Sequence, residues 1–139
     1  MIYHGIRFSV VPGVSAQEVA AGLQAMRDAS SAIPSVRSFV VGRDFGGEYE
    51  FGAVSVIEDL AGYELMMNHP AHLEMDRAGL PLIAKFASFD ITDDEDPELG
   101  AKIAAIHQRR YDANPDVAGL VSDLDEYSGS AAPGKHADQ

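Results

Sequence analysis

Residues 36–57 read VRSFVVGRDFGGEYEFGAVSVI and hold two strand-like segments around a glycine pair. In each segment, Val36–Arg43 and Tyr49–Ile57, apolar side chains recur at every second position, which is the period of a half-buried strand. Gly46-Gly47 stands between them as a short turn signal. The sequence therefore predicts an antiparallel hairpin at this point of the chain.

A strand and a helix are predicted before this hairpin. Ile2–Val10 alternates in the same way, and its apolar face carries His4. Ser15 and Glu18 have the spacing of a capping box, so we expect a helix to begin there and to fade near Ser30.

A second helical region and a last strand are predicted after the hairpin. Asp59–Asn68 has helical spacing, His69-Pro70 interrupts it, and the spacing resumes to about Ala84. Lys85–Ile91 then has the pattern of a strand. The resulting order, β-α-β-β-α-β over residues 1–92, predicts an α+β domain of ferredoxin-like topology with a four-stranded antiparallel sheet.

One face of such a sheet carries no helices. An apolar sheet face left open to water is unfavourable, and a second copy of the chain is the simplest cover. We therefore predict a homodimer in which two sheets pack together as a dimeric α/β barrel.

The remaining residues predict a helical C-terminal extension, 93–127, and a disordered tail, 128–139. Asp96-Pro97 and Asn114-Pro115 each have a capping residue followed by proline, which suits the first helical position. Both helices carry apolar residues, so the extension is expected to dock on the core or on a partner chain. The tail is small and polar. His107, within the extension, is expected to be a solvated surface group.

Composition excludes several classes of function. The formal net charge of −12 repels phosphate backbones and anionic lipids, so neither nucleic acid nor a membrane is an expected partner. The absence of cysteine removes disulfides, thiolate nucleophiles and cysteine metal ligands. No apolar run approaches the roughly 18 residues of a membrane span and no signal-peptide pattern is present, so we expect a cytoplasmic protein.

The first candidate catalytic residue is His72. Pro70 suits the first turn of a helix, and positions at helical spacing after His72 form one stripe: Met75, Gly79, Leu82, Ile83 and Phe86. The imidazole is thus expected to face the apolar interior, where a neutral ring can exchange a proton near pH 7. The alternative interpretation is a structural histidine that is hydrogen-bonded to the backbone.

His4 and Arg37 are further candidates. His4 is either structural or a second histidine in the same cavity between helix and sheet. Arg37 stands among apolar residues of its strand, and it is either a rim residue or the group that holds a carboxylate or enolate of a ligand. His69 and His72 have a spacing compatible with a shared metal, but no third ligand is evident, so we predict no metal site and no cofactor.

Six short motifs occur in the order and spacing of one known family. They all lie within residues 1–92 and are Ile2–Phe8, Val11–Ser15, Ile33–Val36, Val41–Asp44, His69–His72 and Phe89-Asp90. Together these motifs resemble the stress-responsive dimeric A/B barrel family, whose members are typically homodimers with two sheets packed into a barrel. The resemblance does not reach the extension.

The resemblance also implies a pocket and candidate roles. Some members of the family are stress-induced proteins without established chemistry, whereas others are a lyase and a cyclase that closes a polyketide ring. By resemblance to the cyclase, His72 is the general base and His4 lines the pocket. The cyclase's catalytic tyrosine corresponds to Met66 here, which cannot hydrogen-bond an enolate, and Tyr63 stands one helical turn earlier.

The substrate-binding residues expected from this register are Ile6, Phe8, Arg37, Phe39, Phe51, Met66 and Phe86. We therefore expect a homodimer that binds a small apolar or aromatic molecule, as a cofactor-independent cyclase or lyase with a pocket histidine as general base. The alternative is a non-catalytic stress-responsive dimeric protein. A monooxygenase-like dimeric barrel is a weaker alternative, because the chain has no tryptophan.

Overall fold

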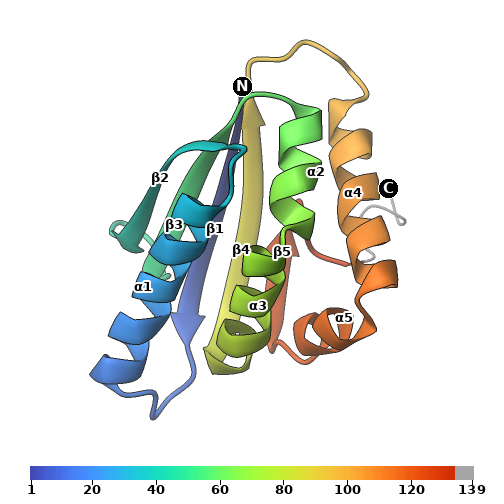
Figure 1. Cartoon of the computed structure of the whole chain (residues 1–139). Helices are drawn as coiled ribbons and strands as arrows, with labels where there is room; N and C mark the ends of the chain where they lie inside the picture. Colours follow the sequence, from blue (N-terminus) through green and yellow to red (C-terminus); the bar gives the residue numbers. More distant parts are fainter. Residues whose placement is uncertain (134–139) are drawn as a thin grey trace.

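The computed structural model describes residues 1–133, which form one sheet with helices packed on one of its faces (Figure 1). The elements, in chain order, are β1 (Ile2–Val10), α1 (Ala16–Ala32), β2 (Val36–Arg43), β3 (Phe51–Ile57), α2 (Leu60–Asn68), α3 (Pro70–Gly79), the 3₁₀ turn η1 (Leu80–Leu82), β4 (Ile83–Thr92), α4 (Leu99–Ala113), α5 (Pro115–Ser122) and β5 (Glu126–Gly129). In this part of the chain no helix is both long and apolar enough to cross a membrane.

The five strands lie side by side in the order β2-β3-β1-β4-β5. The first four pair antiparallel, in the predicted ferredoxin-like arrangement, and β5 adds parallel to β4. The α+β fold and its topology are thus confirmed, and the sheet is one strand wider than predicted.

The helix starts follow the capping signals of the sequence. The Ser15 hydroxyl accepts a hydrogen bond from the Glu18 amide, and the Glu18 carboxylate accepts one from the Ser15 amide, both at 3.1 Å. This is the predicted capping box, and it starts α1 one residue later. The His69 ring accepts a hydrogen bond from the Ala71 amide at 3.1 Å, so His69 caps α3.

The strand register decides which side chains face the helices. Residues directly opposite each other on neighbouring strands share a face. Ile6 on β1 is opposite both Ala53 on β3 and Ser88 on β4, and these side chains face the helical layer. Tyr3 is opposite Val56 and Ile91, and these side chains lie on the face without helices.

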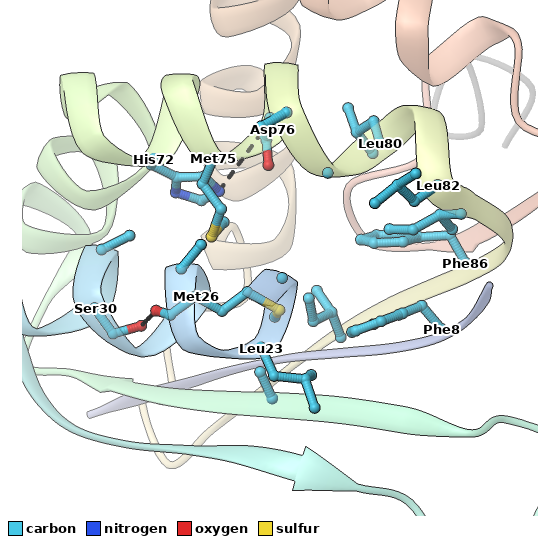
Figure 2. A pocket seen from close by; sticks show the side chains of 18 of the residues that line it. Phe8, Leu23, Met26, Ser30, His72, Met75, Asp76, Leu80, Leu82 and Phe86 are labelled. Carbon is cyan, nitrogen blue, oxygen red and sulfur yellow. Dashed lines mark hydrogen bonds and ion pairs between the residues drawn. The ribbon is translucent and has the colours of Figure 1, made fainter. Parts of the chain in front are cut away.

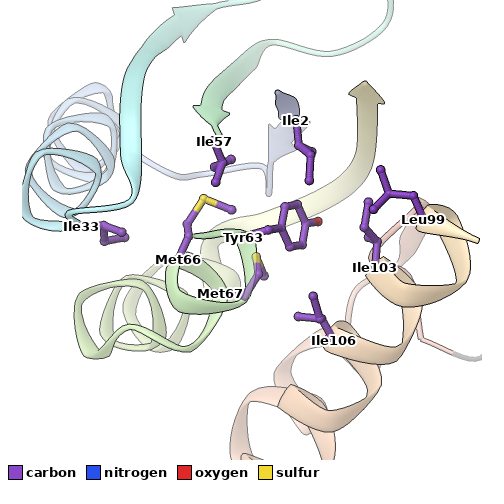
Figure 3. Close-up of a cluster of buried hydrophobic side chains, with 9 residues drawn as sticks. All are labelled: Ile2, Ile33, Ile57, Tyr63, Met66, Met67, Leu99, Ile103 and Ile106. Atoms are coloured by element: carbon purple, nitrogen blue, oxygen red, sulfur yellow. The ribbon is translucent and has the colours of Figure 1, made fainter. Parts of the chain in front are cut away.

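A buried apolar cluster joins the sheet to α2 and α4 (Figure 3). It consists of Ile2, Ile33, Ile57, Tyr63, Met66, Met67, Leu99, Ile103 and Ile106. A second cluster joins α5 to η1 around Leu80, Tyr111, Val117 and Val121. The extension therefore docks on the core of its own chain, which is one of the two arrangements expected from its sequence. Because the chain continues directly into β5, the extension is taken from here on as residues 93–133.

Three sequence expectations need correction. α3 ends at Gly79 instead of near Ala84, because Pro81 lacks the amide that an α-helix requires and lies in η1. β4 consequently starts earlier than predicted. The expected disorder from residue 128 is also wrong for its first residues, because Ser128 and Gly129 belong to β5. Residues 134–139 of the expected tail lie outside the described part of the chain.

Candidate functional site

A cavity of about 420 Å³ lies between α1, α3 and the sheet, and apolar side chains form most of its wall. Figure 2 shows His72 and Met75 of α3 pointing toward Met26 of α1, with Phe8 and Phe86 closing one end. This volume is within the range of small-molecule sites. The cavity is thus large enough for a ligand of modest size.

Both histidines predicted as catalytic line this cavity, although they come from β1 and α3. Four of the predicted substrate-binding residues also line it: Ile6, Phe8, Met66 and Phe86. The period of two in β1 and the apolar stripe after His72 thus led to residues that the fold brings together.

Arg37, Phe39 and Phe51, also predicted to bind substrate, are not brought to the cavity wall. The Arg37 guanidinium forms a 2.9 Å ion pair with Glu58, and its side chain is 55% exposed. Phe39 lies on the edge strand β2 and is 36% exposed. Phe51 packs against the Phe8 ring, with 5.7 Å between ring centroids. Phe8 lines the cavity, whereas Phe51 does not.

The contacts of His72 fix its tautomer. Its Nδ1 lies 3.1 Å from the Met66 carbonyl oxygen. Since a carbonyl only accepts hydrogen bonds, Nδ1 carries the proton and Nε2 has a free lone pair. Nε2 is 3.7 Å from an Asp76 oxygen, too far for a hydrogen bond, and Arg110 donates to that same oxygen at 2.5 Å.

Burial lowers the pKa of the His72 imidazole to about 4. Asp76 opposes this shift, whereas Arg110 and His4 add to it. His72 is therefore neutral near pH 7, and Nε2 is unprotonated there.

His4 is held by a carboxylate. Its Nδ1 lies 2.8 Å from Oδ1 of Asp90, which is directly opposite on β4. Burial alone would raise the pKa of Asp90, but the hydrogen bonds from His4 and Ser130 and the proximity of His4 and His107 hold it below its usual value. Asp90 is therefore an anion that accepts the Nδ1 proton. Nε2 of His4 has no hydrogen-bond partner among residues 1–133.

Tyr63 and His107 complete a buried polar cluster that the sequence analysis did not predict. The Tyr63 hydroxyl lies 3.1 Å from Oδ2 of Asp90 and 2.7 Å from Nε2 of His107. Burial and the nearby Asp90 charge raise the pKa of Tyr63. Burial, and then His4, lower the pKa of His107 to about 3.

The expectation that His107 is a surface group is wrong, because only 3% of the residue is exposed. The sequence held one signal that His107 is buried. His107 follows Ile103 by four residues, so both lie on the same face of α4. That face packs on the core, and it carries His107 inward with Ile103 and Ile106.

The extension also supplies part of the cavity wall. Its contributions are Arg110, Tyr111, Val121, Tyr127 and Ala131. The Arg110 guanidinium is buried, donates to the Met67 carbonyl at 2.5 Å and pairs with Asp76. Because Arg110 is tied to two groups at the end of α2 and in α3, this wall is firmly attached to the core.

Within residues 1–133, no three His, Asp or Glu side chains are grouped so that they could hold one metal ion. His69 and His72 are engaged separately, one in capping α3 and the other with the Met66 carbonyl.

Comparison with known proteins identifies the larger part of the chain. Residues 2–93 match the family model of the Stress responsive A/B Barrel Domain. This match ends where the extension begins. No curated protein sequence is similar enough to this chain to count as a match.

Solved structures share the fold of the same region. A Dabb-family protein with a ferredoxin-like fold from Mesorhizobium loti is 26% identical, with a TM-score of 0.62 over 67% of this chain and 96% of that one. A dimeric ferredoxin-like protein of unknown function from Thermobifida fusca is 23% identical, with a TM-score of 0.61 over 66% and 89%. A hydroxynitrile lyase from Passiflora edulis is 14% identical, with a TM-score of 0.61 over 68% and 94%.

Proposed function

Because this chain belongs to the stress responsive A/B barrel domain family, we propose that it is a homodimeric small-molecule-binding protein that acts as a cofactor-independent cyclase or lyase. A pocket histidine serves as the general base. One observation carries this proposal: His4 and His72 line the same cavity, and Nδ1 of each ring is held by an oxygen acceptor. Each Nε2 is then the basic nitrogen.

The two histidines have different surroundings, which suggests different roles. Near pH 7 His72 is neutral, so its Nε2 is ready to take a proton from a bound ligand. His4 is backed by the Asp90 carboxylate, which stabilises the ring when it gains a second proton. We assign His72 as the general base and His4 as the second acid/base group.

The cavity wall favours an apolar ligand with one polar group. Its far end is formed by side chains such as Phe8, Leu23, Leu82 and Phe86, which offer no hydrogen bonds. A small aromatic carbonyl compound would place its ring there and its carbonyl near the histidines. Lyase and aldol-type cyclase reactions both involve proton transfer next to a carbonyl or nitrile group, and the proposed base supplies that step.

Proton exchange in deuterium oxide tests the base without knowledge of the substrate. The probe is phenylacetone, whose benzylic protons exchange slowly in water and are followed by NMR. The wild-type protein should accelerate exchange by roughly 10²–10⁴-fold, the usual contribution of a positioned base. H72N and H4N keep an amide near the Nδ1 position but lack the basic Nε2. Each should lose most of the acceleration while it retains the wild-type circular dichroism spectrum.

A non-catalytic stress-responsive dimer is the second candidate function. It is favoured by the contact of His72 with the Met66 carbonyl, which is also typical of a structural histidine. The same experiment separates the two. Binding of phenylacetone without accelerated exchange supports the non-catalytic protein, whereas acceleration that depends on His72 supports the enzyme.

The homodimer is proposed from the sheet face that carries no helices. Three apolar side chains on it are strongly exposed: Tyr3 at 40%, Val40 at 63% and Ile91 at 61%. Val54, Val56 and Phe89 lie between them on the same face by register and are half-buried. A contiguous apolar face of this kind is typical of a protein interface. A second copy of the chain, related by a two-fold axis, can cover this face with the same face of its own sheet.

Light scattering coupled to gel filtration tests the dimer. The wild type should elute with twice the mass of the chain. I91E and V40E place a charge on the open face, and both should reduce the mass to one chain. L65E is the matched control, because Leu65 is 47% exposed on α2 and away from the open sheet face. A monomeric wild type would contradict the proposal.

A further inference from the structure

The C-terminal extension reaches the His4–Asp90 pair through two hydrogen-bonding groups. His107 of α4 contacts the Tyr63 hydroxyl, which lies against Asp90. Ser130, directly after β5, donates to Oδ2 of Asp90 at 2.6 Å. These residues lie beyond 93, where the family match ends. The extension thus contacts a cluster whose other members belong to the family domain.

The direction of each hydrogen bond follows from the acceptors. Asp90 as an anion can only accept, so Tyr63 donates its one proton to Oδ2 and His4 donates Nδ1–H to Oδ1. His107 must then donate Nε2–H to the Tyr63 oxygen. Nδ1 of His107 is then unprotonated, and it is buried without a hydrogen-bond partner among residues 1–133. A buried lone pair without a partner is less costly than a buried N–H without one.

A competing arrangement lies within reach. The Tyr63 oxygen is also 3.1 Å from Nδ1 of His4. If Tyr63 turned its proton toward Nδ1, His4 would give up its 2.8 Å hydrogen bond to Asp90 and carry its own proton on Nε2, so Nε2 would no longer be the basic nitrogen. The hydrogen bond that His107 donates to the Tyr63 oxygen opposes this rotation, because the rotation would turn the accepting lone pair away from His107.

We propose that His107 is a positioning residue of the site, which holds the Tyr63 proton on Asp90 and thereby keeps the His4 proton on Nδ1. The role of His4 in chemistry rests on the function proposed above, but the position of its proton does not. The groups that face His4 are Asp90 on β4, Tyr63 on α2, His107 on α4 and, more distantly, His72 on α3.

Nitrogen-15 NMR of the full-length protein, labelled at histidine, tests this directly at pH 7 and without any ligand. The wild type should show His4 with its proton on Nδ1 and His107 with its proton on Nε2. In H107F the share of His4 with its proton on Nε2 should rise roughly tenfold, the change expected for loss of one strong hydrogen bond. H107Q keeps a side-chain amide donor for Tyr63 and should restore the wild-type tautomer of His4.

Two further variants separate positioning from packing. Y63F/H107F lacks the competing hydroxyl, so His4 should return to the Nδ1-protonated form. I106A removes buried apolar volume from the same helix without contact to the cluster, so it should lower stability and leave the His4 tautomer unchanged.

An unchanged His4 tautomer in H107F, or an equal change in I106A, would overturn the proposal. H107N, whose shorter amide does not reach Tyr63, carries the same expectation if H107F does not fold. Because no ligand is used, failure of this proposal is distinguishable from failure of the proposed function, which would appear as absent proton exchange.

Discussion

His4 and Asp90 face each other directly across β1 and β4, and 2.8 Å separates Nδ1 of the ring from Oδ1 of the carboxylate. The pair spans 86 residues of sequence and exists because the strand register is fixed. A slip of one residue would turn one of the two side chains to the opposite face of the sheet. The histidine–carboxylate pair is therefore a direct product of the fold, and several measurable properties depend on it.

The Tyr63 hydroxyl is expected to contribute strongly to stability. Y63F leaves the buried His107 donor without an acceptor and removes one donor from Asp90, so it should lower the free energy of unfolding by about 1–3 kcal/mol. Y127F is the comparison outside the Asp90 cluster, because the Tyr127 hydroxyl interacts with Ser88, at 3.4 Å, and with Tyr111. Urea titration measures both, and equal losses would contradict the importance of the Asp90 cluster.

Stability should fall as the solution is acidified below pH 6.5. The pKa of His72 is about 4 and that of His107 about 3 in the folded chain, against 6.5 for an ordinary histidine. Between pH 6.5 and 4 the unfolded chain therefore binds more protons than the folded one, and acid favours unfolding. Each histidine should add up to about 1.4 kcal/mol per pH unit to the slope.

Urea unfolding at pH 7, 6, 5 and 4.5 measures this dependence. H107Q should have a shallower slope than the wild type, because it lacks one of the two groups. The lowered pKa of Asp90 contributes little in this window, because an unfolded aspartate gains most of its protons near and below pH 3.8. A free energy of unfolding that stays constant down to pH 4.5 would show that the histidines are not buried as described.

The ion pair between Arg110 and Asp76 should tune the basicity of His72. Arg110 lowers the pKa of His72 and Asp76 raises it. R110Q should therefore raise that pKa above about 4, and D76N should lower it further. NMR titration of the His72 ring follows both variants, and shifts of the same sign in the two would be incompatible with this arrangement.

Gly129 should be required for the docking of β5. Its φ is +108°, and an added Cβ would lie 1.7 Å from the Ser88 carbonyl oxygen. G129A should therefore detach β5 and speed hydrogen exchange and proteolysis at residues 126–133. G119A is the matched control, because Gly119 lies in α5 with open space around it and an alanine there favours helix by up to about 1 kcal/mol. Equal protection of β5 in G129A and the wild type would contradict its attachment.

The sequence predicted those features that depend on local pattern. The period of two in Ile2–Val10 placed His4 on the apolar face of its strand, and Ser15 and Pro70 marked helix starts. The residues of the stripe from His72 to Phe86 all line the cavity, although they belong to α3, η1 and β4 and not to the single helix that the sequence predicted. Such features depend on residues a few positions apart, which a sequence displays directly.

What the sequence did not predict depends on tertiary contacts. β5 has only four residues, and it forms because Gly129 fits against the Ser88 backbone. Arg37 was predicted as either a rim residue or an anion holder, and its ion pair with Glu58 is a contact that the sequence pattern did not indicate. His107 could have been placed from its helical spacing, whereas its contact with Tyr63 required knowledge of how α4 packs on α2.

We propose that His4 and His72 belong to one ligand cavity. Titration of the histidine-labelled protein with phenylacetone, observed at the ring nitrogens of both residues, tests this. Both rings should shift together with one dissociation constant, and M26W, which fills the cavity beside His72, should abolish both shifts. Saturable binding that shifts one ring and leaves the other unchanged, or shifts that persist in M26W, would contradict it.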